Sequence, residues 1–211
     1  MRVPGVLRRL LIAILLTALP VAVGTLVLDE DERTAPPPPA YESTPLERYD
    51  TATVTVARAP FCDRLPEEAV TEALGGDTGE VTSYGNGERA QLAPGVEDVA
   101  HEYGCRIAGT GGTEARAWLF APPVTRSRAT ELVASAAERG ACTQQQQAPS
   151  YGEPTLALVC PAGDRRFASF RGLFGDAWLS CSVAAPESVG DAELLDRAGR
   201  FCVAVAEVAS G

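Results

Sequence analysis

The longest apolar stretch of the chain is residues 10–28, in which no residue is charged. At 1.5 Å per residue in a helix, this stretch spans about 28 Å, close to the hydrocarbon thickness of a bilayer. Arg8 and Arg9 precede the stretch, and four acidic residues follow it. Because positive flanks stay in the cytoplasm, we expect a cytoplasmic tail at residues 1–9, a transmembrane signal-anchor at residues 10–28, and an extracytoplasmic C-terminal part.

A secreted protein, released after signal cleavage, is the alternative, because residues 22–24 form a small-x-small sequence of the kind that is cut after an apolar core. A bacterial lipoprotein would need a cysteine directly after the apolar run, whereas the first cysteine is Cys62. Residues 29–50 follow as an acidic, proline-rich linker. Its four consecutive prolines, residues 36–39, favour an extended polyproline helix, which suits a stalk between membrane and domain.

Residues 51–211 carry the periodicities of one folded domain. Alternation of apolar and polar residues predicts strands at residues 51–57, 101–108, 114–121, 155–160, 166–170 and 177–183. Helical spacing with start and stop signals predicts helices at residues 65–74, 127–139 and 191–208. Residues 77–99 and the glutamine run at 144–147 are predicted loops. Sequential strands with short connections favour an antiparallel sheet packed by helices on one face, in the α+β class.

Composition excludes several chemistries. All 18 basic residues are arginine, so the chain has no Walker-A lysine, Schiff base or Ser-x-x-Lys nucleophile. One histidine and no Cys-x-x-Cys pair leave no ordinary zinc site, and no calcium-loop motif is present. We therefore expect no metal and no cofactor. After residue 28 the chain has fifteen arginines against 28 acidic residues, a net charge of −13, which disfavours nucleic acid as a partner.

Six cysteines in an exported domain indicate disulfides, each stabilising the fold by roughly 2–4 kcal/mol. Fifteen pairings are open to six cysteines. The facing of predicted elements favours one bond from the last strand to the apolar stripe of the last helix. A second bond would join the start of the first helix to the following strand, and elimination leaves a third across the glutamine loop. The expected pairs are Cys181–Cys202, Cys62–Cys105 and Cys142–Cys160.

A recurrent pattern covers roughly residues 60–120. Residues 61–66 are FCDRLP, residues 73–76 are ALGG, and residues 103–107 are YGCRI. This pattern resembles exported disulfide-containing domains of unknown function from actinobacterial envelope proteins and lipoproteins, which have a Cys-x-x-Leu start, a helix ending in Leu-Gly and a second cysteine in a strand. The chain departs from them in Arg106 and in lacking the lipoprotein cysteine. The resemblance implies an envelope location and supports the Cys62–Cys105 pair, but it implies no activity.

His101 is the only imidazole, and it stands among the acidic residues Glu97, Asp98 and Glu102. No Gly-x-Ser-x-Gly elbow supplies a nucleophile, so we predict no catalytic residue. We interpret the protein as a membrane-anchored extracytoplasmic non-catalytic module: a sensor, an adaptor or an envelope-interaction domain. A small cell-envelope hydrolase that uses carboxylates or a serine with His101 is the alternative.

The segment 167–178, FASFRGLFGDAW, is the candidate partner surface. Aromatic residues and arginine are enriched at interface hot spots, which singles out Phe170, Arg171, Phe174 and Trp178. The competing interpretation places the aromatic rings in the core, because the domain has few others. Besides the membrane, which residues 10–28 would contact, the expected partner is an envelope protein or a small ligand.

Overall fold

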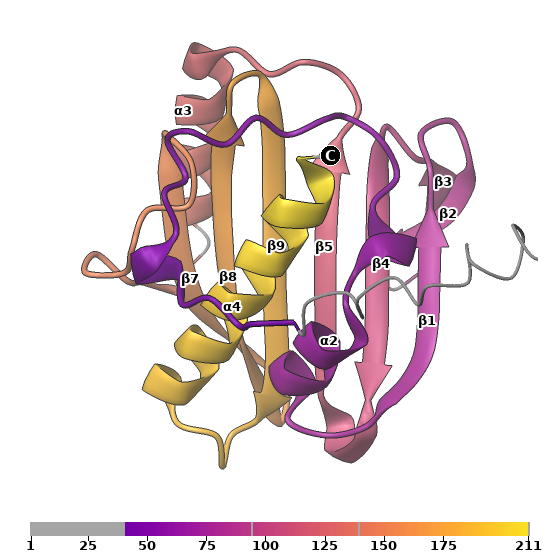
Figure 1. Ribbon diagram of the computed structural model, residues 1–211, viewed down its shortest axis with the longest axis vertical. Coiled ribbons are helices and arrows are strands. Elements are labelled where there is room, and N and C mark those ends of the chain that lie inside the picture. Colours follow the sequence, from indigo (N-terminus) through magenta and orange to yellow (C-terminus); the bar gives the residue numbers. More distant parts are fainter. Residues whose placement is uncertain (1–40, 94, 139, 211) are drawn as a thin grey trace, which may run out of the picture. The chain divides into compact units, whose positions relative to one another are not determined.

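In the computed structural model, which describes residues 41–93, 95–138 and 140–210, an antiparallel seven-stranded sheet forms the middle layer (Figure 1). The order of strands across this sheet is β1-β4-β5-β9-β8-β7-β6, and a separate hairpin pairs β2 with β3. The predicted α+β class with a large antiparallel sheet is confirmed. The strands are β1 (Thr78–Tyr84), β2 (Arg89–Ala93), β3 (Val96–Val99), β4 (Glu102–Gly109), β5 (Glu114–Phe120), β6 (Thr143–Gln144), β7 (Thr155–Ala162), β8 (Arg165–Phe174) and β9 (Ala177–Pro186).

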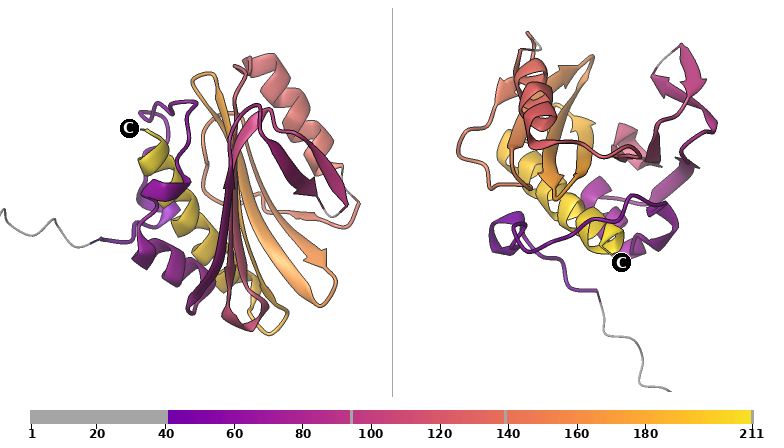
Figure 2. Two further views of the ribbon diagram at one scale, coloured as in Figure 1. Left: turned by 90° about the vertical axis from the view of Figure 1, so that its right-hand side faces the viewer. Right: turned by 90° about the horizontal axis from the view of Figure 1, so that it is seen from above.

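Three α-helices are described, and they lie on both faces of the sheet, not on one face as predicted (Figure 2). The helices α2 (Glu67–Leu74) and α4 (Asp191–Ala209) cover one face, and α3 (Arg126–Ala137) covers part of the other. The reason lies in β7, which is apolar on both sides. Leu156 and Leu158 pack with Ala136 of α3, whereas Ala157 and Val159 join the core beneath α4. A strand with two apolar faces needs cover on both.

The helices begin and end near the predicted positions, and α2 has the predicted start and stop signals. Pro66 precedes α2, and Gly75 ends it in the left-handed conformation at φ 64°. The side chain of Thr125 accepts a hydrogen bond from the backbone N–H of Arg128 and so caps α3. Asp191 lies in the first turn of α4, where a negative charge is stabilised by the helix dipole.

The main core lies between the sheet and α4. Cys181 of β9 and Cys202 of α4 are both fully buried and form a disulfide at a Cα–Cα distance of 5.6 Å. Leu179 and Val183 lie on the same side of β9 as Cys181, as the two-residue period requires. The three disulfides are the expected ones: Cys62–Cys105, Cys142–Cys160 and Cys181–Cys202.

The N-terminal described segment, residues 41–61, lies against α4. The compact unit begins at Tyr41, so residues 41–50, which we expected in the linker, belong to it. The predicted strand at residues 51–57 is wrong: no strand forms there. Val56 is nevertheless buried, and the N–H of Ala57 donates to the carbonyl of Ala209 at 2.8 Å. The segment satisfies its backbone at the end of a helix and not at a sheet edge.

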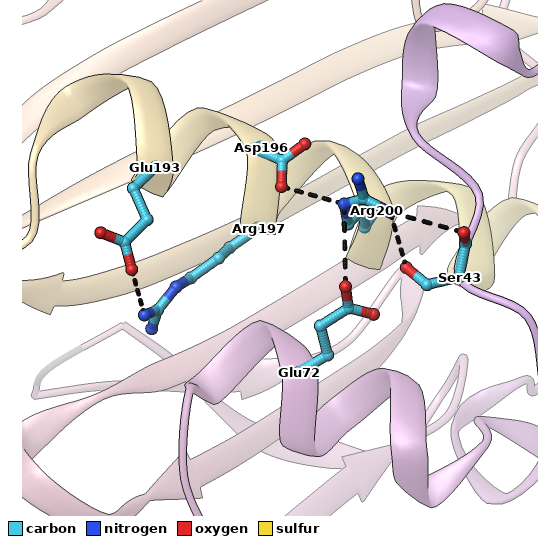
Figure 3. Close-up of polar contacts among 6 residues, drawn as sticks. All are labelled: Ser43, Glu72, Glu193, Asp196, Arg197 and Arg200. Carbon is cyan, nitrogen blue, oxygen red and sulfur yellow. Dashed lines mark hydrogen bonds and ion pairs between the residues drawn. The ribbon is translucent and has the colours of Figure 1, made fainter.

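Arg200 of α4 fastens this segment to the domain (Figure 3). Its guanidinium donates to Ser43 Oγ at 3.1 Å and to Asp196 Oδ2 at 2.9 Å, and it forms a longer ion pair with Glu72 of α2 at 3.7 Å. One side chain therefore joins the entering chain, α2 and α4.

The region 77–99, which was predicted as loop, contains β1, β2 and β3. The exposed side chains of β1 show no apolar alternation, so the pattern gave no strand signal. The backbone of β1 pairs with β4 and thereby makes the edge of the sheet. The large apolar residues that stay exposed among the described residues all lie in this region: Val81, Val96 and Val99.

A close backbone crossing fixes the core beside β8. A Cβ atom on Gly172 would lie 1.4 Å from the carbonyl oxygen of Tyr151, so only glycine fits there. Tyr151 is fully buried, packs edge-on against Phe174 with ring centroids 4.9 Å apart, and donates its hydroxyl to the carbonyl of Cys202 at 2.9 Å. Gly172 thus lets the loop before β7 join β8 and α4 in one core.

We expect Gly172→Ala to abolish folding or to lower the thermal midpoint of the full chain strongly, because the neighbour of the new methyl group is backbone and cannot rotate away. Gly190→Ala is the control, since Gly190 has a φ of −66° and no atom within 4 Å of an added Cβ. Circular dichroism melting of both variants measures the difference. Equal midpoints would contradict the close crossing.

Candidate functional site

The sheet face opposite α4 has a groove along β9. The residues of β9 on this face are Trp178, Ser180, Ser182 and Ala184, since Cys181 and Val183 point into the core. Beyond Trp178, the small side chains of Ser180, Ser182 and Ala184 leave a depression along β9. The neighbouring strands β5 and β8 carry larger residues on the same face, so a channel forms between them.

A cavity of about 550 Å³ occupies this channel. Helix α3 borders it with Leu132, Ser135 and Ala136, and the rest of its lining comes from the sheet. We call this cavity the β9 groove. Its lining residues on the strands are Glu114, Arg116, Trp118, Phe120, Ala162, Arg165, Phe167, Arg171, Trp178, Ser182 and Ala184.

Arg171 reaches across the groove to an aromatic ring. The register places Ser180 between Arg171 of β8 and Trp118 of β5. Because the serine side chain is short, the guanidinium can extend over β9, and its carbon lies 5.9 Å from the centre of the Trp118 ring. A cation–π contact of this kind stabilises the orientation by about 0.5–2 kcal/mol.

Glu114 organises the arginines at one side of the groove. Its carboxylate accepts a hydrogen bond from Arg106 Nε at 2.8 Å and forms an ion pair with Arg116. Burial raises the pKa of Glu114, but the hydrogen bonds and charges of Arg116 and Arg106 outweigh that effect and hold the pKa below its ordinary value of 4.5. Glu114 is therefore ionised at neutral pH, and one carboxylate is shared by two guanidinium groups.

The lining is positively charged overall. It contains Arg116, Arg165 and Arg171 against Glu114 alone, a net charge of +2. Arg165 is fixed by a hydrogen bond from its Nη1 to the carbonyl oxygen of Gly112 at 3.1 Å, in the 3-10 turn η3 (Thr110–Gly112). A lining with more guanidinium groups than carboxylates can bind an anion.

Two buried hydroxyl groups lie on the groove side of the sheet. Ser180 and Ser169 have no exposed surface, and their Oγ atoms have no hydrogen-bond partner among the described residues. Ser169 pairs across the strands with Ser182, which lines the groove. Buried polar groups usually have partners, so this pair of hydroxyls is unusual.

Beyond the groove, the same face continues onto β4 and β1. The ring of Tyr84 lies over Gly104, where an added Cβ would come within 2.0 Å of it, and the hydroxyl donates to Glu102 Oε1 at 2.6 Å. Burial raises the pKa of both Tyr84 and Glu102. Gly104 is in turn the strand neighbour of Trp118.

The structure divides the predicted partner patch between two faces. Phe170 and Phe174 lie in the core beneath α4, each 2% exposed. Arg171 and Trp178 line the β9 groove. The four residues therefore do not form one surface, because adjacent positions of a strand point to opposite faces.

His101 is exposed and lies outside the groove lining. No hydrogen bond from its ring to a serine or carboxylate is found in the described part of the chain. Within the described ranges, no cluster of three or more His, Cys, Asp or Glu residues could hold a metal ion.

Sequence reasoning missed most of the groove. Trp118, Arg116 and Glu114 alternate along β5 with the buried residues Ala115 and Ala117. This alternation of large polar or aromatic residues with small core residues was a usable signal. A matching one appears on β9, where the other tryptophan of the chain also follows alanine and precedes leucine.

Comparisons with known proteins do not assign the chain to a family. No protein-family model and no curated protein matches the sequence. Among solved structures, a GTP binding regulator from Thermotoga maritima is similar over 74% of this chain and 94% of that chain, with 9% sequence identity and a TM-score of 0.33. A likeness of this size carries no argument about function.

The Glu114 cluster gives a pH-dependent stability. Because the folded-state pKa is depressed, the stabilisation is present above the unfolded value near 4.5 and is lost as the pH falls through the lower folded value. We expect Glu114→Gln to be less stable than wild type at pH 7 and to show a smaller loss on acidification. Urea unfolding of the full chain between pH 7 and pH 3 measures this.

The control for that experiment is Glu131→Gln. It removes the Arg128–Glu131 ion pair, whose side chains are both 62% exposed, and we expect a change below about 1 kcal/mol at pH 7. A Glu114→Gln profile parallel to that of wild type would contradict the shared-carboxylate interpretation.

Proposed function

We propose that the protein is a membrane-anchored module whose disulfide-bonded domain lies outside the cytoplasm and binds a small ligand in the β9 groove without chemical conversion. Two independent features support the location of the domain outside the cytoplasm. Three disulfides fit an oxidising compartment, and the uncharged stretch 10–28 has the length and flanks of a signal-anchor.

The single observation that carries the binding role is the lining of the groove. Its volume of about 550 Å³ lies within the range of about 300–1,000 Å³ that is typical of small-molecule sites. Such sites combine an apolar and aromatic lining with a few fixed polar groups. The aromatic part of the groove lining includes Trp118, Trp178 and Phe167, and the arginines are its fixed polar groups. This combination favours a small ligand over an envelope protein as the partner.

The hydrolase alternative has no such support. It needs a base next to a nucleophile and a substrate. His101 is exposed and does not line the cavity, and the groove serines have no imidazole beside them in the lining.

The location of the domain is tested by fusing alkaline phosphatase to the C-terminus of the full chain. This enzyme is active only outside the cytoplasm, so we expect activity, recovered with the membrane fraction if the anchor is retained. A fusion that lacks residues 10–28 is the control and should be inactive. Activity of a cytoplasmic reporter at the same position, with an inactive phosphatase, would contradict the proposal.

The binding role is tested by mass spectrometry of small molecules that co-purify with the full chain from native membranes. We expect a ligand with wild type and its loss in Ser182→Phe, because a ring on the groove floor would fill the channel. Ala184→Leu serves as a second filling variant. Thr82→Phe, on the exposed β1, adds the same ring outside the lining and should keep the ligand.

Binding in the groove would be overturned if a ligand still co-purified with both filling variants, or if no ligand co-purified with wild type. Hydrolysis of an envelope substrate that His101→Ala abolishes would instead establish the hydrolase.

A further inference from the structure

We infer that the β9 groove selects a small amphiphilic anion, a molecule that joins a carboxylate or phosphate group to an apolar body. This inference rests on the proposed function and specifies the ligand of that site.

The charge of the groove is opposite to that of the domain around it. After residue 28 the chain has a net charge of −13, yet the groove lining has three arginines and one glutamate. In so acidic a chain, cations gathered in one cavity are not explained by composition. Guanidinium groups bind carboxylate and phosphate oxygens through paired N–H donors, and these charge-assisted bonds are stronger than neutral ones.

The arginines are held in place before a ligand arrives. Arg171 lies over the Trp118 ring, Arg165 donates to the Gly112 carbonyl, and Arg116 is paired with Glu114. Three different kinds of partner therefore fix three guanidinium groups around one channel. Binding then loses less side-chain entropy than it would with mobile arginines.

The lining contains more arginines than carboxylates. The Gly112 carbonyl that holds Arg165 carries no net charge, and Glu114 is shared between Arg116 and Arg106. An arriving oxyanion would therefore meet a lining with a net charge of +2.

The remaining lining is apolar and fits the body of such a ligand. Phe120, Phe167 and Trp178 come from three neighbouring strands, and Leu132 and Ala136 of α3 complete the wall. Burying apolar surface here contributes binding free energy in proportion to area. A bare inorganic anion would leave this surface wet, so the two halves of the lining together point to an amphiphile.

Both tryptophans of the chain line the groove, which provides a specific reporter. The full chain, labelled with 5-fluorotryptophan and placed in phosphatidylcholine nanodiscs, gives two ¹⁹F resonances, assigned with Trp118→Phe. The probes are 4-phenylbutyrate, its neutral analogue 4-phenylbutyramide, and phenethyl phosphate. Titration of each probe yields a dissociation constant from the shift of the resonances.

We expect the better of the two anions to bind about tenfold or more tightly than the amide, because charge-assisted bonds to arginine are lost in the neutral probe. The tighter anion identifies the oxyanion that the groove prefers. Arg171→Gln and Arg165→Gln should each reduce the preference for the anion toward unity. Arg128→Gln is the matched control, because Arg128 is exposed on α3 and outside the lining.

The outcomes separate this inference from the proposed function. Equal affinity for the amide and the anions, or a preference that survives both arginine variants, would overturn the selection of an anion. So would the absence of any shift with either anion at millimolar concentration. The proposed function is judged separately, on the co-purified ligand and its loss in Ser182→Phe. Circular dichroism spectra and thermal midpoints close to those of wild type show that the arginine substitutions leave the fold intact, since the Trp118 resonance itself depends on Arg171.

Discussion

The disulfide between Cys181 and Cys202 sets the orientation on which the other features depend. It holds α4 against β9 and requires Cys181, Leu179 and Val183 to face the core. Because strand residues alternate between faces, Ser180 and Ser182 must then point the other way. The pairing of β9 with β5 and β8 brings their larger residues beside these serines. The covered face and the groove on the opposite face are two consequences of one constraint.

The two faces of the sheet have different kinds of contact. The face under α4 is apolar and closed, and Arg200 fastens the chain that enters the domain to α4 and α2. The opposite face is only partly covered by α3, and its arginines are organised by Glu114, Trp118 and a backbone carbonyl. The attachment of the entering segment and the proposed binding in the groove therefore involve separate residues, so a change in the groove need not disturb the attachment.

Strong local signals made several elements predictable. Helix α2 follows from periodicity between Pro66 and Gly75, α3 and α4 follow from helical periodicity, and the hairpin of β4 and β5 follows from alternation and a Gly-rich turn. The Cys181–Cys202 pair was expected from the facing of the last strand and helix, and Cys142–Cys160 was left by elimination. The edge strand β1 was missed because its side chains are exposed, and its existence depends on backbone pairing with β4. The segment 51–57 has strand-like alternation, but its partner is a helix end.

The sequence by itself determined the class of the fold and the excess of acid, since these follow from local period and residue counts, and it favoured the disulfide pairs that the structure contains. Only the tertiary structure decided the groove. Phe170 and Arg171 are neighbours in sequence but lie on opposite faces, whereas Trp118 and Arg171, 53 positions apart, meet across Ser180. That meeting requires the strand order β5-β9-β8, which is set by the pairing of whole strands and not by the residues of any one segment.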